Sequence, residues 1–259
     1  MTPSPSRSAV YRAPALEKGL DIIELLADAE EPLTLAELAV RLGRSHTEIF
    51  RMVQVLEGRG FLLREATTDG YEITDRLFSL AIRRPVVQTL FETALPIMRV
   101  LATETGHSCH LAVHSRGDMV VVARMESSEL LGFAVRIGYR QPLLETTSGM
   151  VLFAFQDAAT RLRWRELMTP SPTARSFKSL CQRADEVRSR GMDEQASGFV
   201  SGITDMAAPV LRGDVAAAAL TIPFIKLLQP HMDMEEVRSK LLVASSSISR
   251  QLYEQDNRA

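Results

Sequence analysis

The chain has 259 residues, of which 46% are hydrophobic and 24% are charged, so its composition is that of a folded globular protein and excludes wholesale disorder. At about 150 residues per domain, this length predicts two domains. The formal net charge is −2, so any affinity for nucleic acid has to come from a local basic patch. The two cysteines, Cys109 and Cys181, are too few for a disulfide framework and fit a reducing compartment.

The N-terminal segment 1–14 is rich in serine and proline and lacks the apolar core of a signal peptide. Because it has little apolar surface to offset the entropy of ordering, we interpret it as a flexible tail. No apolar run elsewhere is long enough to span a bilayer, so the sequence predicts a cytoplasmic protein without a membrane partner.

Residues 15–82 predict a winged helix–turn–helix domain. Three short helical patterns come first, and the second opens on the capping-box pair Thr34 and Glu37. Two strand-like runs follow, at 61–64 and 71–73, and the Asp-Gly pair before the second run favours a hairpin turn. Three helices followed by a hairpin are typical of this domain, and the alternative is a small helical bundle with an incidental hairpin.

A basic surface is expected around the third helix, which Ser45 or Thr47 is predicted to cap. The arginines of this region are Arg41, Arg44, Arg51, Arg59 and Arg64. Arginine pairs with phosphates and guanine edges, so the pattern favours a recognition helix in the major groove over a merely solvated charged face. The side chains expected at the DNA are Arg44, Ser45, His46, Thr47, Phe50, Arg51 and Arg64. A salt bridge to Glu48 is the alternative role for Arg51.

Residues 83–95 are predicted to be a linker helix between the domains. An apolar stripe runs from Val87 towards Leu101 at alternating steps of four and three residues. Pro96 is expected to divide this stretch into two helices, Pro85 to Ala94 and Pro96 to Glu104, because proline lacks an amide donor. The stripe fits either a core or a dimer contact, and the dimer contact is favoured because a helix leaving a small domain has little core to join.

Residues 96–259 predict an α+β domain, because strands and helices are segregated along the chain and suit an antiparallel sheet flanked by helices. The predicted strands are 108–114, 119–125, 130–137, 203–211 and 215–224, and the first two are separated by a four-residue hairpin loop, 115–118. The predicted helices begin at Thr147, which acts as a cap, and continue at 158–168, 177–189 and 234–253.

Several short segments of the chain follow one another in an order that is found in a known protein family. They are Ala15 to Ile23, Leu33 to Leu38, Ser45 to Arg51, Gly60 to Leu62, Gly70-Tyr71, Thr147 to Met150, Gly191 to Asp193, Gly202 and Ala207 to Val210. Their order and spacing resemble those of the IclR family of bacterial transcription regulators. The resemblance implies a winged helix–turn–helix domain followed by a GAF-like domain with a small-molecule cavity. Two positions depart from the family pattern: Glu48 replaces a threonine, and Gly198 replaces an acidic residue.

Seven residues are predicted to contact the effector. Thr147 and Ser148 begin a helix, where hydroxyls and unpaired amides suit a carboxylate. The resemblance places Asp205 and Thr221 at ligand-contacting positions. The apolar candidates for the rest of the lining are Met125, Leu130 and Phe133. The alternative roles are a plain helix cap for Thr147, a β-branched strand residue for Thr221 and ordinary core for the apolar three.

Catalysis is not expected, because the sequence has no glycine-rich phosphate loop and no nucleophile elbow. His107, His110 and His114 have a spacing that suggests a metal site. Metal ligands have to converge on one point, however, and neighbouring residues of a strand point to opposite faces of the sheet. This favours the alternative, in which the three are partly buried histidines without a metal. The sequence therefore predicts no metal, no cofactor and no catalytic residue.

The hypothesis is a DNA-binding transcription regulator that senses a small metabolite, an organic or aromatic acid of a catabolic pathway. Its partners are a double-stranded DNA operator, the effector and further copies of the chain in a homodimer or a dimer of dimers. The alternative is a metabolite-binding or enzymatic α+β protein whose helical N-terminal part mediates protein contacts.

Overall fold

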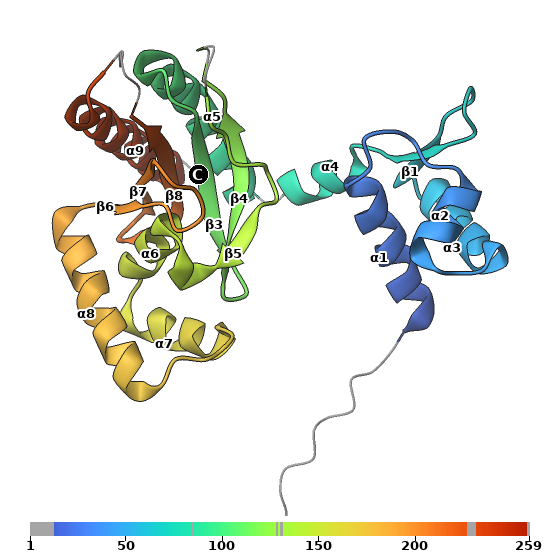
Figure 1. Ribbon diagram of the computed structural model, residues 1–259, viewed down its shortest axis with the longest axis horizontal. Helices are drawn as coiled ribbons and strands as arrows, with labels where there is room; N and C mark the ends of the chain where they lie inside the picture. The colour runs from blue at the N-terminus through green and yellow to red at the C-terminus, as the bar shows by residue number, and fades with distance from the viewer. Residues whose placement is uncertain (1–12, 84, 128, 130–131, 227–231, 258–259) are drawn as a thin grey trace, which may run out of the picture. The chain divides into compact units, whose positions relative to one another are not determined.

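The structure is a computed structural model that describes residues 13–83, 85–127, 129, 132–226 and 232–257. The chain divides into two compact units, Met1–Pro85 and Val86–Ala259 (Figure 1). This boundary falls inside the segment 83–95 that the sequence predicts as a linker. None of the helices in the described residues is long and apolar enough to cross a membrane.

The first unit has the predicted order of three helices and a hairpin, followed by one more short helix. Its elements are α1 (Pro14–Ala27), α2 (Leu35–Leu42), α3 (His46–Gly58), β1 (Leu62–Arg64), β2 (Tyr71–Ile73) and α4 (Arg76–Ile82). The core lies between the first three helices and the hairpin, where Ile22, Leu38, Ile49 and Leu62 are buried. Each such side chain contributes about 1.5–3 kcal/mol by leaving water. This arrangement confirms the predicted winged helix–turn–helix.

Side-chain caps define where α2 and α3 begin. Thr34 and Glu37 form the predicted capping box of α2. The N-cap of α3 is Ser45 rather than Thr47, and Glu48 completes a second capping box with it. Each box satisfies amide donors that the first turn of a helix leaves free. The glutamate that departs from the family pattern therefore has a local structural role at the start of α3.

The hairpin of the first unit differs in detail from the prediction. Strands β1 and β2 are antiparallel, and their register pairs Arg64 with Tyr71. In the Asp69-Gly70 pair, Asp69 has the positive φ, 58°, and Gly70 does not. Gly70 is required by space instead, because a Cβ there would lie 2.7 Å from the Cβ of Pro32.

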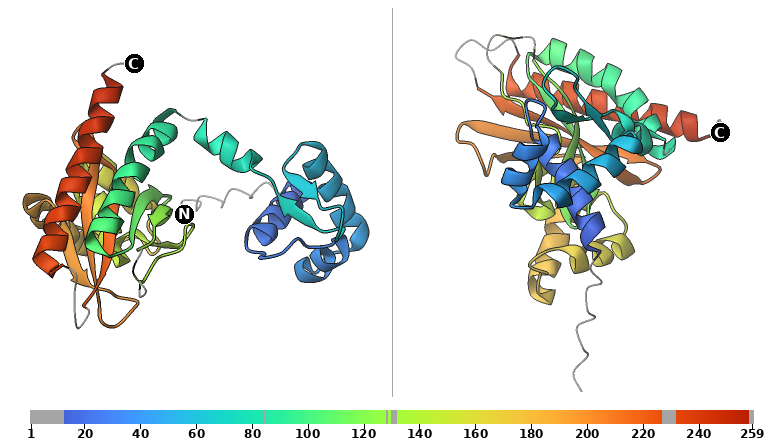
Figure 2. Two further views of the ribbon diagram at one scale, coloured as in Figure 1. Left: turned by 90° about the horizontal axis from the view of Figure 1, so that it is seen from above. Right: turned by 90° about the vertical axis from the view of Figure 1, so that its right-hand side faces the viewer.

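The second unit is an antiparallel sheet between two helical layers (Figures 1 and 2). The strand order is β5-β4-β3-β8-β7-β6, and the strands are β3 (Cys109–Ser115), β4 (Asp118–Met125), β5 (Arg140–Pro142), β6 (Asp193–Ala196), β7 (Ile203–Arg212) and β8 (Val215–Ile225). The helices are α5 (Pro85–Thr105), the 3₁₀ turn η1 (Leu143–Glu145), α6 (Thr147–Ala154), α7 (Ala158–Leu167), α8 (Ala174–Arg190) and α9 (Met234–Asp256). This arrangement confirms the predicted α+β class.

Each face of the sheet has its own core. Helices α5 and α9 lie side by side over one face, as the left view of Figure 2 shows, and share a core with side chains such as Leu111 and Leu220. Helices α6 and α8 cover the other face, where Val151, Phe153 and Val187 are buried. Successive side chains of a strand point to opposite faces, so β3, β7 and β8 contribute to both cores.

The predicted helix break at Pro96 is wrong, because α5 continues through this residue from Pro85 to Thr105. Proline lacks one backbone hydrogen bond, but Ala94, Met98 and Leu101 are fully or almost fully buried against the sheet. Burial of this stripe outweighs the loss of one hydrogen bond, whose net worth is about 0.5–1.5 kcal/mol. These residues, for which the sequence favours a dimer contact, belong to the core of the second unit.

Two strand predictions also need correction, and one strand was not predicted. Ser115 pairs with Asp118, so the β3–β4 loop is the two-residue turn Arg116-Gly117, in which both φ angles are positive, as a primed turn requires. The run 130–137 forms no strand in its described part, 132–137, and β5 follows it instead. Strand β6 lies at the sheet edge with the polar sequence Asp-Glu-Gln-Ala, which carries no alternating pattern to predict it.

Candidate functional site

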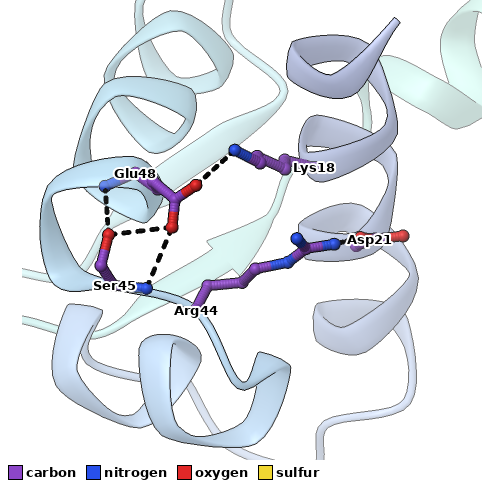
Figure 3. A network of polar contacts seen from close by, with 5 residues as sticks. All are labelled: Lys18, Asp21, Arg44, Ser45 and Glu48. Carbon is purple, nitrogen blue, oxygen red and sulfur yellow. Dashed lines mark hydrogen bonds and ion pairs between the residues drawn. The ribbon is translucent and has the colours of Figure 1, made fainter. Parts of the chain in front are cut away.

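The first candidate site is the start of α3, where two ion pairs link this helix to α1 (Figure 3). Lys18 Nζ lies 2.5 Å from Glu48 Oε1. The other carboxylate oxygen of Glu48 accepts hydrogen bonds from the backbone N–H of Ser45 at 3.2 Å and from its hydroxyl at 2.9 Å. Arg44 lies 3.5 Å from Asp21. Two ion pairs therefore tie the start of α3 to α1. In one of them α1 supplies the cation, and in the other it supplies the anion.

These contacts fix the charge of Glu48. The hydrogen bond from Lys18, followed by those from Ser45, lowers the pKa of this carboxyl to about 2. Glu48 is therefore ionised throughout the neutral range and remains available to Lys18. The alternative role for Arg51 has no support, because no hydrogen bond or ion pair joins Arg51 to any described residue.

All seven side chains predicted to contact DNA are exposed. His46, Thr47, Phe50 and Arg51 lie on α3 itself, and Phe50 is 41% exposed although it is aromatic. Arg44 and Ser45 immediately precede the helix and take part in the contacts with Asp21 and Glu48. The seventh, Arg64, lies on β1 and pairs with Asp69 at 2.9 Å.

The second candidate site is a cavity of about 290 Å³ in the second unit. Its apolar lining residues are Met119, Phe133, Ala134, Val135, Phe199 and Val200, and its polar ones are His110, Arg136, Tyr139, Thr146, Thr147, Ser148, Ser197, Asp205 and Thr221. The rings of Tyr139 and Phe199 form an edge-to-face pair with centroids 6.3 Å apart, so the loops 132–139 and 197–200 touch at this cavity. An apolar chamber with a few polar groups is the usual form of a small-molecule site.

Five of the seven residues predicted to contact the effector line this cavity: Phe133, Thr147, Ser148, Asp205 and Thr221. Met125 does not, because Val122 is an extra residue between the paired positions Val121 and Ala123, and this bulge reverses the alternation of β4. Met125 consequently packs against the core under α5 and α9. Leu130 lies outside the described residues.

The polar residues of the cavity lining include a histidine that was considered from the sequence only as a metal ligand. His110 on β3 pairs in register with Thr221 on β8. Within the described residues, His110 Nδ1 and Thr221 Oγ1 are buried and have no hydrogen-bond partner. Burial lowers the pKa of His110 to about 4, so the imidazole is neutral at physiological pH. Strand alternation places His110 on the cavity face, but only the structure shows that it is unpartnered.

The remaining polar groups come from β7 and the start of α6. Burial raises the pKa of Asp205, and a hydrogen bond with Ser197 opposes this shift. The N-cap of α6 is Thr146 rather than the predicted Thr147, so the helix begins one residue earlier than expected. The hydroxyl of Thr146 accepts a hydrogen bond from the backbone N–H of Gly149. Thr147 and Ser148 therefore occupy the first turn, where backbone N–H groups carry partial positive charge.

The three histidines considered for a metal site make separate contacts. His107 bonds to the carbonyl oxygens of Thr105 and Ile225 at 2.8 and 3.2 Å. His114 accepts from the backbone N–H of Gly117 and stacks on Trp164. The described part of the chain contains no group of three or more His, Cys, Asp or Glu that is placed to hold a metal ion.

Comparisons with known proteins agree on one family. A family model described as the IclR helix-turn-helix domain matches residues 15–66, and one described as the bacterial transcriptional regulator IclR C-terminal domain matches residues 86–250. The HTH-type transcriptional regulator KdgR of Escherichia coli (strain K12) is 28% identical over 240 residues, which is 91% of each protein. The glycerol operon regulatory protein of Streptomyces coelicolor is 27% identical over 248 residues, covering 91% of this chain and 93% of that protein.

Solved structures share the fold. An IclR homolog from Microbacterium hydrocarbonoxydans, determined in complex with 4-hydroxybenzoate, has a TM-score of 0.74 at 21% identity and covers 93% of this chain and 99% of that one. The two family matches together span most of the chain. The protein therefore belongs to the IclR family of transcriptional regulators, which are not enzymes, and has an N-terminal helix–turn–helix domain that binds DNA and the C-terminal domain of this family.

Proposed function

We propose that this regulator acts in the cytoplasm as a homodimer or a dimer of dimers. It binds a double-stranded operator through α3 and the β1–β2 hairpin, and that binding changes when a small organic or aromatic acid enters the cavity. The observation that carries the proposal is the cavity itself, because an apolar chamber with convergent polar groups in a domain joined to a DNA-binding unit is what ligand-dependent regulation requires.

The exposed side of α3 supports its placement in the major groove. Arg44 and Ser45 are engaged by Asp21 and Glu48, so base contacts fall first to the other predicted side chains of α3, which are exposed. Those side chains are His46, Thr47, Phe50 and Arg51. Arg44 and Arg64 then contact phosphates of the DNA backbone. In doing so they exchange their present carboxylate partners, Asp21 and Asp69, for phosphate groups.

The polar groups of the cavity support an acid as the effector. Thr147 and Ser148 line the cavity from the first turn of α6, where the partial positive charge of a helix N-terminus favours an anion. Arg136, also in the lining, adds a positive charge. The 4-hydroxybenzoate complex of a protein with the same fold makes an aromatic acid the first candidate to test.

A symmetric regulator has to hold two recognition helices about one or more helical turns of DNA apart. Exposed apolar side chains on α4 support a contact with a second copy of the chain: Phe78 is 63% exposed and Leu80 is 43% exposed. Helix α5 begins at the boundary between the units and is packed into the core of the second, so a change around the cavity has a covalent route to the first unit. Such coupling is typically worth about 1–3 kcal/mol.

A salt titration tests the DNA contact. A duplex is first selected from a random library by the full-length protein, and its affinity is then measured from about 50 to 200 mM salt beside an unselected duplex. We expect the selected duplex to bind more tightly by a factor of at least about 10³, and the affinity for both to fall steeply as salt rises. An affinity that depends on neither sequence nor salt is the result expected of a protein-contact module and contradicts the proposal.

A further inference from the structure

Three polar side chains form a row across one face of the sheet. His110 pairs with Thr221, and Thr221 pairs with Ala207, two residues from Asp205 on the same strand. Paired residues and residues two apart share a face, so His110, Thr221 and Asp205 all point to the face that α6 covers. All three line the cavity. This row, drawn from β3, β8 and β7, is called the polar floor below.

Two atoms of the polar floor lack partners. His110 is 5% exposed and Thr221 is 2% exposed, and neither His110 Nδ1 nor Thr221 Oγ1 has a hydrogen-bond partner within the described residues. Buried polar atoms are almost always paired in folded proteins, because an unpaired one loses its bonds to water without replacement. Two such atoms on directly paired residues, facing the same cavity, indicate a place for a polar group of a ligand.

The charges around the floor decide which group fits. The imidazole of His110 is neutral, because burial lowers its pKa to about 4. Asp205 on β7 lines the same cavity, and the arginine in the described lining, Arg136, is exposed. A buried carboxylate at the floor would face Asp205 without a buried cation to offset its desolvation. A neutral hydroxyl avoids this cost, because Thr221 and the neutral imidazole each donate or accept one hydrogen bond.

The rest of the lining has a different character. Arg136 and the first turn of α6 suit an anion, and Met119, Phe133 and Val135 are apolar. We propose that His110 and Thr221 form a subsite that recognises a hydroxyl group of the effector. The effector is then an acid that also carries a hydroxyl group. This inference rests on the proposed role of the cavity as the effector site.

The test compares acids that differ by one hydroxyl group. Calorimetric titration of the full-length protein uses benzoate with 4-hydroxybenzoate and phenylacetate with 4-hydroxyphenylacetate, together with terephthalate, which carries a second carboxylate in place of the hydroxyl. We expect at least one hydroxylated acid to bind more tightly than its partner by a factor of at least about 10, because a site built for a hydroxyl leaves buried groups unpaired with the analogue that lacks it. Terephthalate is expected to bind no better than benzoate.

Two variants assign this preference to the subsite. Thr221→Val and His110→Leu are each expected to reduce the preference to less than about three-fold. Thr204→Val, a matched change on β7 outside the cavity lining, is expected to keep it. The ligand-free Thr221→Val protein should melt at or above the wild-type temperature, because the change removes an unpaired buried hydroxyl.

Equal affinities for the members of every pair, tighter binding of terephthalate, or no binding of any of these acids would each overturn the subsite. So would a preference that survives in both variants, or a Thr221→Val protein that melts well below the wild type. Binding of the selected duplex is measured on the same preparations. A protein that binds this duplex specifically but shows no hydroxyl preference refutes the subsite alone, whereas loss of specific DNA binding in the wild type refutes the proposed function.

Discussion

Replacing Arg51 with alanine is expected to weaken operator binding by about 1–3 kcal/mol, which corresponds to a factor of about 5 to 150. Arg51 is exposed on α3, and no described residue holds its guanidinium in an ion pair. It is therefore available for a bidentate contact with guanine or for a phosphate. Affinities for the selected duplex and for an unselected one distinguish these roles, because loss of a base contact weakens binding of the selected duplex alone, whereas loss of a phosphate contact weakens binding of both.

Two further arginines serve as comparisons for this change. Arg59→Ala alters an exposed arginine at the opposite end of α3 and is expected to have a smaller effect. Arg44→Ala is also expected to weaken binding, and Asp21→Asn, which removes the partner of Arg44, to strengthen it. Wild-type affinity in both Arg51→Ala and Arg44→Ala, with the proteins folded, would show that the start of α3 does not meet DNA.

Replacing Gly149 with alanine is expected to destabilise the second unit by more than about 3 kcal/mol. A Cβ on Gly149 would lie 1.7 Å from the carbonyl oxygen of Leu143 and 2.7 Å from its carbonyl carbon, so α6 has to move away from η1. Backbone atoms cannot yield as the end of a flexible side chain does, and overpacking of this kind is costly. The same displacement moves Thr147 and Ser148, so binding of acids in the cavity should be lost as well.

Guanidinium unfolding followed by the fluorescence of Trp164, the one tryptophan of the chain, measures this change within the second unit. Gly198→Ala is the matched control, because the nearest atom to its added Cβ is 4.0 Å away and its φ is not in the left-handed region. Its stability should stay within about 0.5 kcal/mol of the wild type. Equal midpoints for the two variants would mean that α6 does not approach η1 this closely.

Local signals in the sequence predicted the first unit well. The capping box of Thr34 and Glu37 and the spacing of apolar residues marked its helices, because these are short-range patterns. Glu48 was noted as a departure from the family, but its effect depends on Lys18, thirty residues earlier. A contact of that sequence separation follows from how α1 and α3 pack, which periodicity does not specify.

The second unit shows where sequence patterns stop being sufficient. Thr147 and Ser148, predicted from their place at a helix start, line the cavity, and so do Asp205 and Thr221, which the family resemblance implied. Met125 was misplaced because a single bulge at Val122 reverses the alternation of β4, and no local signal marks that residue. His110 escaped notice as a cavity residue because its environment, a buried and unpartnered position beside β8, exists only after the sheet has formed.

Coupling between the cavity and DNA is tested most directly by one binding cycle. The affinity of the full-length protein for its selected duplex is measured at fixed salt, without ligand and with a saturating hydroxy acid that binds the cavity. We expect the acid to change this affinity by a factor of about 5 to 150. By reciprocity, the duplex should change the affinity for the acid by the same factor. An acid that binds the cavity and leaves the affinity for the duplex unchanged would contradict a regulatory role for this site.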